Sequence, residues 1–418
     1  MAKLSKLYAH EILDSRADPT VEVVAILDSG EYGVASVPSG TSTGSYEAVE
    51  LRDNDPARYL GRGVLTAVGH VNSEIASALV GKEIQSVNDI DAQLVKLDGT
   101  PEKKRLGANA ILGVSMAITK ALASLAKIPL YKYIANIAGN DQILFIPSPI
   151  FNMINGGSHG AGNLDFQEFH VIPNKFHSFA ASLETGVVIY QTIKKLLARR
   201  GAIHSVGYEG GFAPNLFTNL DALEILQESI TETGHKPGID VELGLDVAAN
   251  AFYKDGRYSI KDRSSPMDSA EFIDYLRDLN GQYHLRLLED ALAEDDWKAW
   301  VSLSAELATV TTIVGDDLLA TNLTKVKKAI TDRACSGAII KPNQIGSVSE
   351  TIEFTKLVRS ANWKIVASHR SGETNDTFIA DFAVGIGADY AKFGAPARGE
   401  RVAKYNRLLS IETELAQK

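Results

Sequence analysis

Eight short apolar runs that begin after residue 145 constrain the fold of this chain more than any other feature. Segments with an amphipathic helical pattern separate most of them, which is typical of parallel α/β structure. Eight is also the number of strands that a closed (β/α)8 barrel needs. The runs are 149–154, 166–172, 241–247, 284–288, 312–314, 338–340, 364–367 and 390–393. Because no helical segment separates the first two runs, we expect the barrel to begin irregularly.

The residues before these runs predict a separate domain. The chain has 418 residues, which is too many for one ordinary hydrophobic core. The predicted elements of this first part are strands at 21–27 and 32–37 and helices at 64–80, 90–97 and 108–126. We therefore predict an α+β domain over residues 1–138, followed by a barrel domain over residues 139–418.

Composition narrows the class of protein. The net charge is −10 and the isoelectric point is about 5.5, which disfavours a general nucleic-acid-binding protein. Cys335 is the single cysteine, so no disulfide can form within the chain, and a reducing compartment is expected. We see neither a signal peptide nor an apolar run that approaches membrane-spanning length. The expectation is a cytoplasmic protein with no nucleic-acid or membrane partner.

Charged residues stand where consecutive runs end. In an α/β barrel the carboxyl ends of the strands share one rim, where active sites are built. A single charge at a strand end is usually just solvated, but a series of six is not explained in that way. The residues are Asp246, Glu289-Asp290, Asp316-Asp317, Lys341, His369-Arg370 and Lys392.

Three of these acids, Asp246, Glu289 and Asp316, indicate a metal site. Neighbouring carboxylates repel one another unless a cation lies between them. An all-oxygen ligand set without Cys or His favours Mg²⁺ or Mn²⁺ over Zn²⁺. The alternative is a set of separate salt bridges to Lys341 and Lys392.

Proton transfer needs a base and an acid. A lysine beside a bound metal has a lowered pKa, so Lys341 could remove a proton next to a carboxylate while the metal holds the charge of the enolate-like product. Two residues are candidates for the acid: Glu209, in the glycine-rich segment 207–215, and Glu168, whose apolar neighbours could raise its pKa. The residues alone do not decide between them.

Two polar stretches complete the candidate site. Residues 368–374 read Ser-His-Arg-Ser-Gly-Glu-Thr after a strand, and Arg370 and Ser371 there suit a phosphate or carboxylate. Residues 39–45 are small and polar, with two glycines. They fit either a solvated loop or a mobile lid that carries hydroxyl groups.

Ten segments in order resemble the enolase family, in its bacterial form, over nearly the whole chain. They are 13–16, 39–44, 106–110, 155–159, 167–169, 209–215, 245–249, 315–318, 341–346 and 368–374. The resemblance implies reversible dehydration of 2-phosphoglycerate to phosphoenolpyruvate by a lysine base with Mg²⁺, the pairing described for the enolase superfamily. It also implies an irregular barrel of the order ββαα(βα)6 and a homodimer or a higher assembly of dimers.

The resemblance also assigns roles to individual residues. Two Mg²⁺ ions are implied: a conformational ion on Asp246, Glu289 and Asp316, and a catalytic ion that Ser42 helps to bind. Lys341 matches the base and Glu209 the acid, with Glu168 beside it. His159 matches a histidine on a closing loop. The matches to substrate-side residues are Gln167, His369, Arg370, Ser371 and Lys392.

Departures from the family pattern leave alternatives open. They occur at Ala17-Asp18, at Tyr208 before the candidate acid, and at Ser410, where the family often has an arginine that pairs with Glu22 across the dimer. One alternative is another superfamily member, such as an acid-sugar dehydratase or racemase. The other is an enolase-fold scaffold or binding protein with weak or lost catalysis. The family also implies an occasional cell-surface or secreted fraction.

Overall fold

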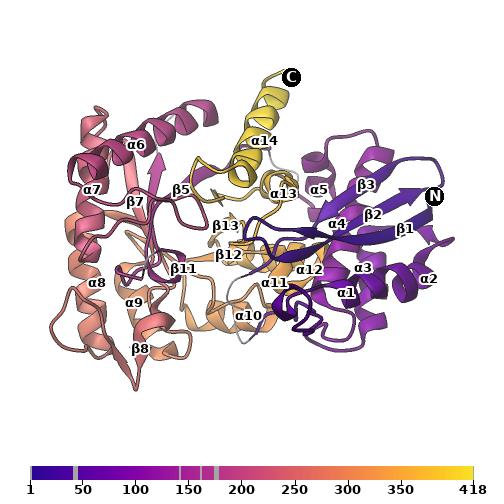
Figure 1. Cartoon of the computed structure of the whole chain (residues 1–418), viewed down its shortest axis with the longest axis horizontal. Coiled ribbons are helices and arrows are strands. Elements are labelled where there is room, and N and C mark those ends of the chain that lie inside the picture. Colours follow the sequence, from indigo (N-terminus) through magenta and orange to yellow (C-terminus); the bar gives the residue numbers. More distant parts are fainter. Residues whose placement is uncertain (1, 41–45, 141–142, 161, 174–177, 418) are drawn as a thin grey trace.

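The computed structural model describes residues 2–40, 46–140, 143–160, 162–173 and 178–417. An N-terminal α+β domain packs beside a barrel domain (Figure 1). The N-terminal sheet has the order β3-β2-β1-β4, and its printed strand pairs are all antiparallel. Its strands are β1 (Ala2–Leu13), β2 (Pro19–Leu27), β3 (Tyr32–Ser36) and β4 (Glu83–Ile84). The predicted strands at 21–27 and 32–37 are confirmed.

The longest strand, β1, was not predicted. Its buried and exposed residues alternate, but the register shifts between Leu4 and Lys6 where it pairs with β2. A bulge of this kind breaks the two-residue period by which a half-buried strand is recognised in a sequence.

Helices cover the N-terminal sheet. They are α1 (Leu65–His70), a π-helical turn (Val71–Ile75), α2 (Ala76–Leu79), α3 (Val87–Asp98), α4 (Ala108–Leu125) and α5 (Leu130–Ala138). In the described part of the chain, α4 alone is long and apolar enough to cross a membrane, with a mean hydropathy of 1.4. By length and hydropathy, the expectation of no such run was wrong. However, 83% of this helix is buried inside the protein, which is typical of a core helix.

Eight strands form the closed barrel that was predicted. They are β5 (Ser148–Asn155), β6 (Glu168–Pro173), β7 (Val241–Asp246), β10 (Leu285–Glu289), β11 (Thr312–Gly315), β12 (Gly337–Ile340), β13 (Lys364–Ser368) and β14 (Tyr390–Lys392). Strand β6 is antiparallel to both of its neighbours, β5 and β7, whereas the other pairs are parallel. Apolar side chains fill the interior; they are Ile150, Ile172, Leu287, Val314, Ile339, Val366 and Tyr390.

The connections confirm the irregular order ββαα(βα)6. Among the described residues, no helix longer than one turn separates β5 from β6, and two helices separate β6 from β7. The barrel helices are α6 (Phe179–Arg199), α7 (Asn219–Glu232), α8 (Ser269–Tyr283), α9 (Trp297–Leu307), α10 (Leu323–Asp332), α11 (Pro342–Ile345), α12 (Val348–Ser360), α13 (Phe378–Gly385) and α14 (Gly399–Ala416). A small hairpin, β8 (Tyr253–Lys254) and β9 (Arg257–Tyr258), follows β7.

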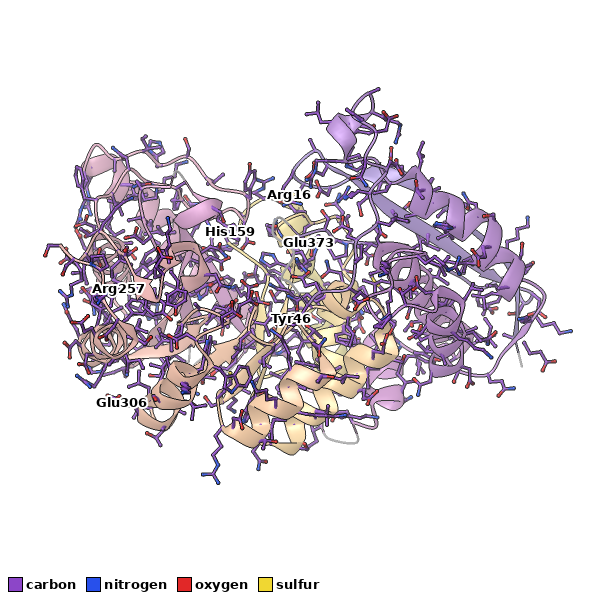
Figure 2. All side chains as sticks on the ribbon, turned by 90° about the horizontal axis from the view of Figure 1, so that it is seen from below. Arg16, Tyr46, His159, Arg257, Glu306 and Glu373 are labelled. Atoms are coloured by element: carbon purple, nitrogen blue, oxygen red, sulfur yellow. The ribbon has the colours of Figure 1, made fainter. Side chains whose placement is uncertain are left out.

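The two domains meet at the rim of the barrel. Ser39 and Gly372 exchange two backbone hydrogen bonds, of 2.7 and 2.9 Å, so the N-terminal domain is fixed against the stretch 368–374. A Cβ atom on Gly372 would lie 2.2 Å from a carboxylate oxygen of Asp14, so any other residue there would have to displace that side chain. Figure 2 shows Arg16 and Glu373 between the domains, and Arg257 and Glu306 on the far side of the barrel.

Candidate functional site

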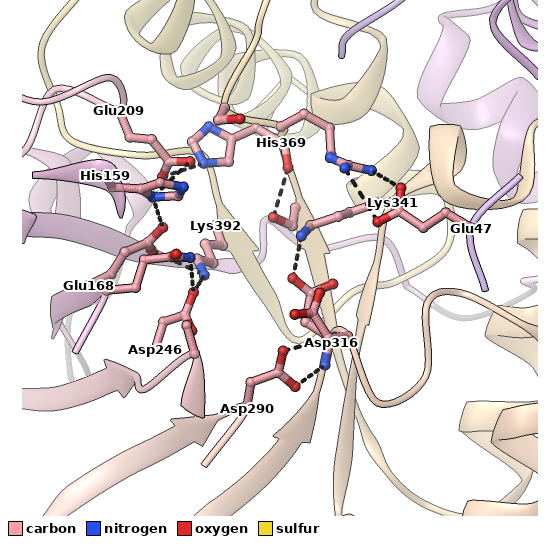
Figure 3. A pocket seen from close by; sticks show the side chains of 16 residues that line it. Glu47, His159, Glu168, Glu209, Asp246, Asp290, Asp316, Lys341, His369 and Lys392 are labelled. Carbon is pink, nitrogen blue, oxygen red and sulfur yellow. Dashed lines mark hydrogen bonds and ion pairs between the residues drawn. The ribbon is translucent and has the colours of Figure 1, made fainter. Parts of the chain in front are cut away.

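The strand ends of the barrel meet in one pocket. Most of the sequence-predicted site residues line it, namely His159, Gln167, Glu168, Glu209, Asp246, Asp316, Lys341, His369, Arg370, Ser371 and Lys392 (Figure 3). Glu289 lies directly behind this lining, where its carboxylate contacts Lys392. Ser42 lies outside the described residues. The rim therefore gathers acids, lysines and an arginine from strand ends and loops that are distant in the sequence.

Lys392 is the central cation of this pocket. Its Nζ lies 2.7 Å from Oε2 of Glu289, 3.1 Å from Oδ2 of Asp246 and 3.1 Å from Oε2 of Glu168. Burial disfavours its charged form, but these carboxylates outweigh burial and raise its pKa well above the usual value. A single ammonium group thus neutralises part of a buried acidic cluster.

Lys341 pairs with the third candidate metal ligand. Its Nζ is hydrogen-bonded to Oδ2 of Asp316, and Gln344 donates to the other oxygen at 3.1 Å. Burial lowers the pKa of Lys341, yet the charge of Asp316 outweighs burial, so the pKa is raised. The sequence-based expectation was a lowered pKa, caused by the like charge of a metal ion bound beside the lysine. The salt bridges weighed as the alternative to a metal site are present.

The two lysines do not satisfy all of the buried carboxylate oxygens at the rim. Glu289 is fully buried, and its Oε1 has no hydrogen-bond partner. Burial, followed by the charge of Asp246, raises the pKa of Glu289 well above its usual value. Burial also raises the pKa of Asp246. An unpartnered carboxylate oxygen beside two other acids is the donor set that a hard divalent cation satisfies, so the residues fit a metal ion.

A second acidic group adjoins this one. Ligand atoms of Asp290, Asp316 and Asp317 lie within 4.8 Å of one another. The carboxylate of Asp290 accepts the backbone N–H groups of Asp316 and Asp317, at 2.9 and 2.8 Å. Asp290 therefore fixes the end of β11 and the position of Asp316. Sequence reasoning noted Asp290 as a strand-end acid but not this bracing role.

The opposite wall of the pocket carries the candidate acids and histidines. Nδ1 of His159 lies 3.2 Å from Oε1 of Glu168 and 3.7 Å from Oε1 of Glu209. Oε2 of Glu168 also contacts His170, at 2.8 Å. Potential ligand atoms of His159, Glu168 and Glu209 also lie within 4.8 Å of one another.

Both glutamates are held in the ionised form. Burial opposes the charge of Glu168, but Lys392 and hydrogen bonds from two histidines outweigh it and lower the pKa well below the usual value. The expectation that apolar neighbours raise the pKa of Glu168 was wrong, because Lys392 on β14 and the two histidines, His159 and His170, lower it. Burial and Glu168 likewise oppose the charge of Glu209, yet His369 and His159 lower its pKa to about 2.

The candidate anion-binding stretch, residues 368–374, contains Arg370 and Ser371. Nη1 of Arg370 lies 3.0 Å from Oε2 of Glu47 and 3.0 Å from Oδ1 of Asn343. Arg16 donates to Oγ of Ser371 at 3.2 Å. Sequence reasoning missed Glu47, which belongs to the N-terminal domain. Glu47 comes shortly after the polar segment 39–45. Its position beside a candidate lid was the only feature of the sequence that could have marked it as a site residue.

Gln167 and His159 lie on the side of the pocket that carries Glu168 and Asp246. Nε2 of Gln167 lies 3.4 Å from Oδ2 of Asp246, and its Oε1 accepts from Ser158 at 3.1 Å. Figure 3 shows His159 and Glu168 facing Glu209 and His369 across a short distance, with Lys341 and Asp316 on the far side.

These observations define a class. The protein is a two-domain α/β-barrel protein in which an N-terminal α+β domain packs against a barrel rim lined by carboxylates and lysines. The residues 4–134 match the family model "Enolase, N-terminal domain", and residues 143–418 match "Enolase, C-terminal TIM barrel domain". Together these matches span almost the whole chain, and the chain belongs to the enolase family.

Proposed function

We propose that this protein is a phosphopyruvate hydratase, which catalyses the reversible, Mg²⁺-dependent dehydration of 2-phosphoglycerate to phosphoenolpyruvate in glycolysis and gluconeogenesis. The main support is the arrangement of Lys341 and Glu209 on different sides of one pocket. A base on one side and an acid on the other suit removal of a proton and of hydroxide from adjacent carbons.

Asp246, Glu289 and Asp316 are the proposed ligands of the conformational Mg²⁺. The buried, unpartnered Oε1 of Glu289 supports this assignment. Ser42, outside the described residues, is the proposed ligand of the second ion. Bound Mg²⁺ supplies positive charge that stabilises the enolate-like form of the substrate carboxylate.

Lys341 is the proposed base at carbon 2. It accepts a proton only as the neutral amine, so its ion pair with Asp316 must be weakened first. Asp316 is also a proposed metal ligand, which links the freeing of Lys341 to metal binding. Lys392 and Gln167 are the proposed partners of the substrate carboxylate and the adjoining metal.

Glu209 is the proposed acid that protonates the leaving hydroxide. The lowered pKa keeps it ionised in the free protein, which is the form that takes a proton from water in the hydration direction. Dehydration needs its protonated form. His159, Glu168 and His369 surround it, and His369 lies within hydrogen-bond distance of its carboxylate, which favours the ionised form.

Arg370 and Ser371 are the proposed phosphate ligands. The planar guanidinium suits two phosphate oxygens. Glu47 already contacts Arg370 in the free protein, so phosphate must share or replace that carboxylate. We propose further that the protein acts in the cytoplasm as a homodimer.

The test is formation of the enol phosphate from 2-phosphoglycerate, followed by ultraviolet absorbance with and without Mg²⁺. We expect absorbance to rise only with the metal present. Lys364→Ala is a suitable control, because this exposed lysine pairs with Asp389 away from the pocket. Absence of turnover at saturating Mg²⁺ would favour the scaffold alternative over an active enzyme.

A further inference from the structure

Arg401 lies on α14 with no exposed surface, beside the pocket but outside its lining. Its Nη1 lies 2.7 Å from Nδ1 of His369 and 2.6 Å from the carbonyl oxygen of Arg370. Its Nη2 donates to the carbonyl oxygens of Ser371, at 2.6 Å, and Tyr208, at 3.2 Å. One guanidinium group therefore joins the anion-binding stretch to the loop that carries the candidate acid.

The chemistry of these groups fixes the tautomer of His369. A guanidinium group offers only N–H donors and stays protonated in proteins. Nδ1 of His369 must therefore be the acceptor, with a free lone pair, and the ring proton must be on Nε2. That Nε2 lies 3.0 Å from Oε2 of Glu209, so it donates to this carboxylate. A doubly protonated His369 would place an N–H group against an N–H group of Arg401.

This tautomer has a consequence for Glu209. Its Oε2 also accepts from Nδ2 of Asn152, at 3.2 Å, so both lone pairs of Oε2 are used by donors. Its Oε1 lies 3.7 Å from Nδ1 of His159, beyond an ordinary hydrogen bond. Oε1 is thus the oxygen that remains to carry a transferable proton.

We propose that Arg401 is a positioning residue that holds His369 as the Nε2–H tautomer, and that His369 and Asn152 thereby orient Glu209 so that Oε1 is its proton-carrying oxygen. The link to proton transfer rests on the proposed function. The link from Arg401 to the tautomer rests on geometry alone and can be tested in the free protein.

The charged surroundings of His369 are consistent with a neutral ring. Burial and the charge of Arg401 lower the pKa of His369, against the opposing charges of Glu209 and Glu373. Arg401 also lies 3.5 Å from Glu400, a neighbour on its own helix, which stabilises the guanidinium charge.

The decisive measurement is the tautomer of His369 in the substrate-free, full-length protein. Protein labelled with ¹⁵N at histidine would be studied by long-range ¹H–¹⁵N correlation, and the signal assigned by its loss in His369→Gln. We expect an unprotonated Nδ1 and a protonated Nε2 near neutral pH. A protonated Nδ1 would overturn the proposal, whether or not the protein dehydrates 2-phosphoglycerate.

Substitution of Arg401 tests the cause. In Arg401→Met we expect Nδ1 to become protonated in part of the molecules, and Arg401→Lys should restore the original tautomer at least partly. Arg407→Lys is the matched control, since Arg407 lies on the same helix but binds Asp381 and Glu414. A folded Arg401→Met protein with an unchanged His369 signal would contradict the proposal. If that variant does not fold, the spectrum of the unsubstituted protein decides alone.

Turnover provides the second readout. Arg401→Met should lower kcat by at least about tenfold, whereas the same change in a His369→Gln background should add little, because both act through one oxygen of Glu209. Equal, additive losses in the two backgrounds would show that Arg401 acts independently of His369. Such a result would refute the link to Glu209 and leave the proposed function unaffected.

Discussion

Nζ of Lys392 lies 2.7 Å from Oε2 of Glu289, and both side chains are buried at the rim of the barrel. The same ammonium group contacts Asp246 and Glu168. Removing one partner of a buried ion pair usually costs more than the pair itself contributes, because the remaining charges have no compensation. Lys392 therefore stabilises the free protein as well as forming part of the site.

We predict that Lys392→Met lowers the free energy of unfolding by about 3–5 kcal/mol without metal. Added Mg²⁺ should recover more stability in the variant than in the unsubstituted protein, since the acids then lack any other cation. Urea denaturation with and without Mg²⁺ measures both effects. Lys364→Met, at an exposed ion pair, should cost about 1 kcal/mol or less. Similar losses in the two variants would contradict this role of Lys392.

Glu289→Gln should have the opposite signature. The change removes a buried carboxyl group whose pKa is raised by burial and by the charge of Asp246, so without metal the variant should be at least as stable as the unsubstituted protein near pH 7. The increase in Tm on adding Mg²⁺ should become smaller, because a metal ligand is lost. Glu294→Gln is the control, since Glu294 is near in sequence but pairs with Lys325. An undiminished Mg²⁺ effect would exclude Glu289 as a ligand.

Lys341→Ala should abolish abstraction of the proton at carbon 2. We expect solvent exchange of that proton to fall by at least about 100-fold, the usual scale of general base catalysis. The measurement is deuterium uptake by 2-phosphoglycerate, with far-ultraviolet circular dichroism to show that the variant is folded. Persistent exchange in a folded variant would show that another group is the base.

The placement of the predicted metal ligands and the predicted base at one rim could be predicted from the apolar runs that precede them. Asp246 and Lys341 follow apolar runs, and the barrel brings the ends of such runs to one rim. The register shift in β1 hid that strand, since it interrupts the alternation of buried residues. Local sequence patterns therefore predicted most strands of the barrel, but fewer strands of the N-terminal sheet.

Contacts between distant parts of the chain could not be predicted in this way. Glu47 and Arg370 are 323 residues apart and belong to different domains. Arg401 reaches His369 from the last helix, where it has the pattern of an ordinary helix residue. The pKa of Glu168 was misjudged for the same reason, because Lys392, which lowers it most, is distant in the sequence and belongs to another strand.

Asp91 should make the docking of the two domains sensitive to pH. Its Oδ2 accepts the N–H of Ser349 across the domain interface at 2.8 Å, and its Oδ1 is buried without a partner. Burial raises the pKa of Asp91 from 3.8 to about 6. The folded protein thus prefers the protonated acid, so this contribution to stability is full below about pH 4 and is lost as the pH rises through 6.

We therefore predict that Asp91→Asn is more stable than the unsubstituted protein at pH 7.5, by up to about 3 kcal/mol. The difference should shrink on acidification to pH 4.5, as measured by urea denaturation across this range. Asp278→Asn, at an exposed position, should show no such trend. A stability difference that is constant with pH would mean that Asp91 does not titrate in this window.

Ser410 should weaken the proposed dimer. It lies exposed on α14 and donates to the carbonyl oxygen of Asn406. Glu22, which the family often pairs with an arginine across the dimer, instead accepts from Oγ of Ser36 at 2.6 Å and contacts His10 at 3.2 Å. We therefore expect a dimer that dissociates on modest dilution or in moderate salt, as followed by light scattering. A tight dimer under both conditions would refute this expectation.

A gain-of-contact variant separates this ion pair from other causes of weak association. Ser410→Arg should tighten the dimer by about tenfold, since each of two symmetry-related pairs contributes up to about 1 kcal/mol. Glu22→Gln should cancel that gain. Thr413→Arg is the matched control, because it adds the same charge to another exposed position of α14. If both arginines tightened the dimer equally, the cause would be the added positive charge in general and not a specific ion pair with Glu22.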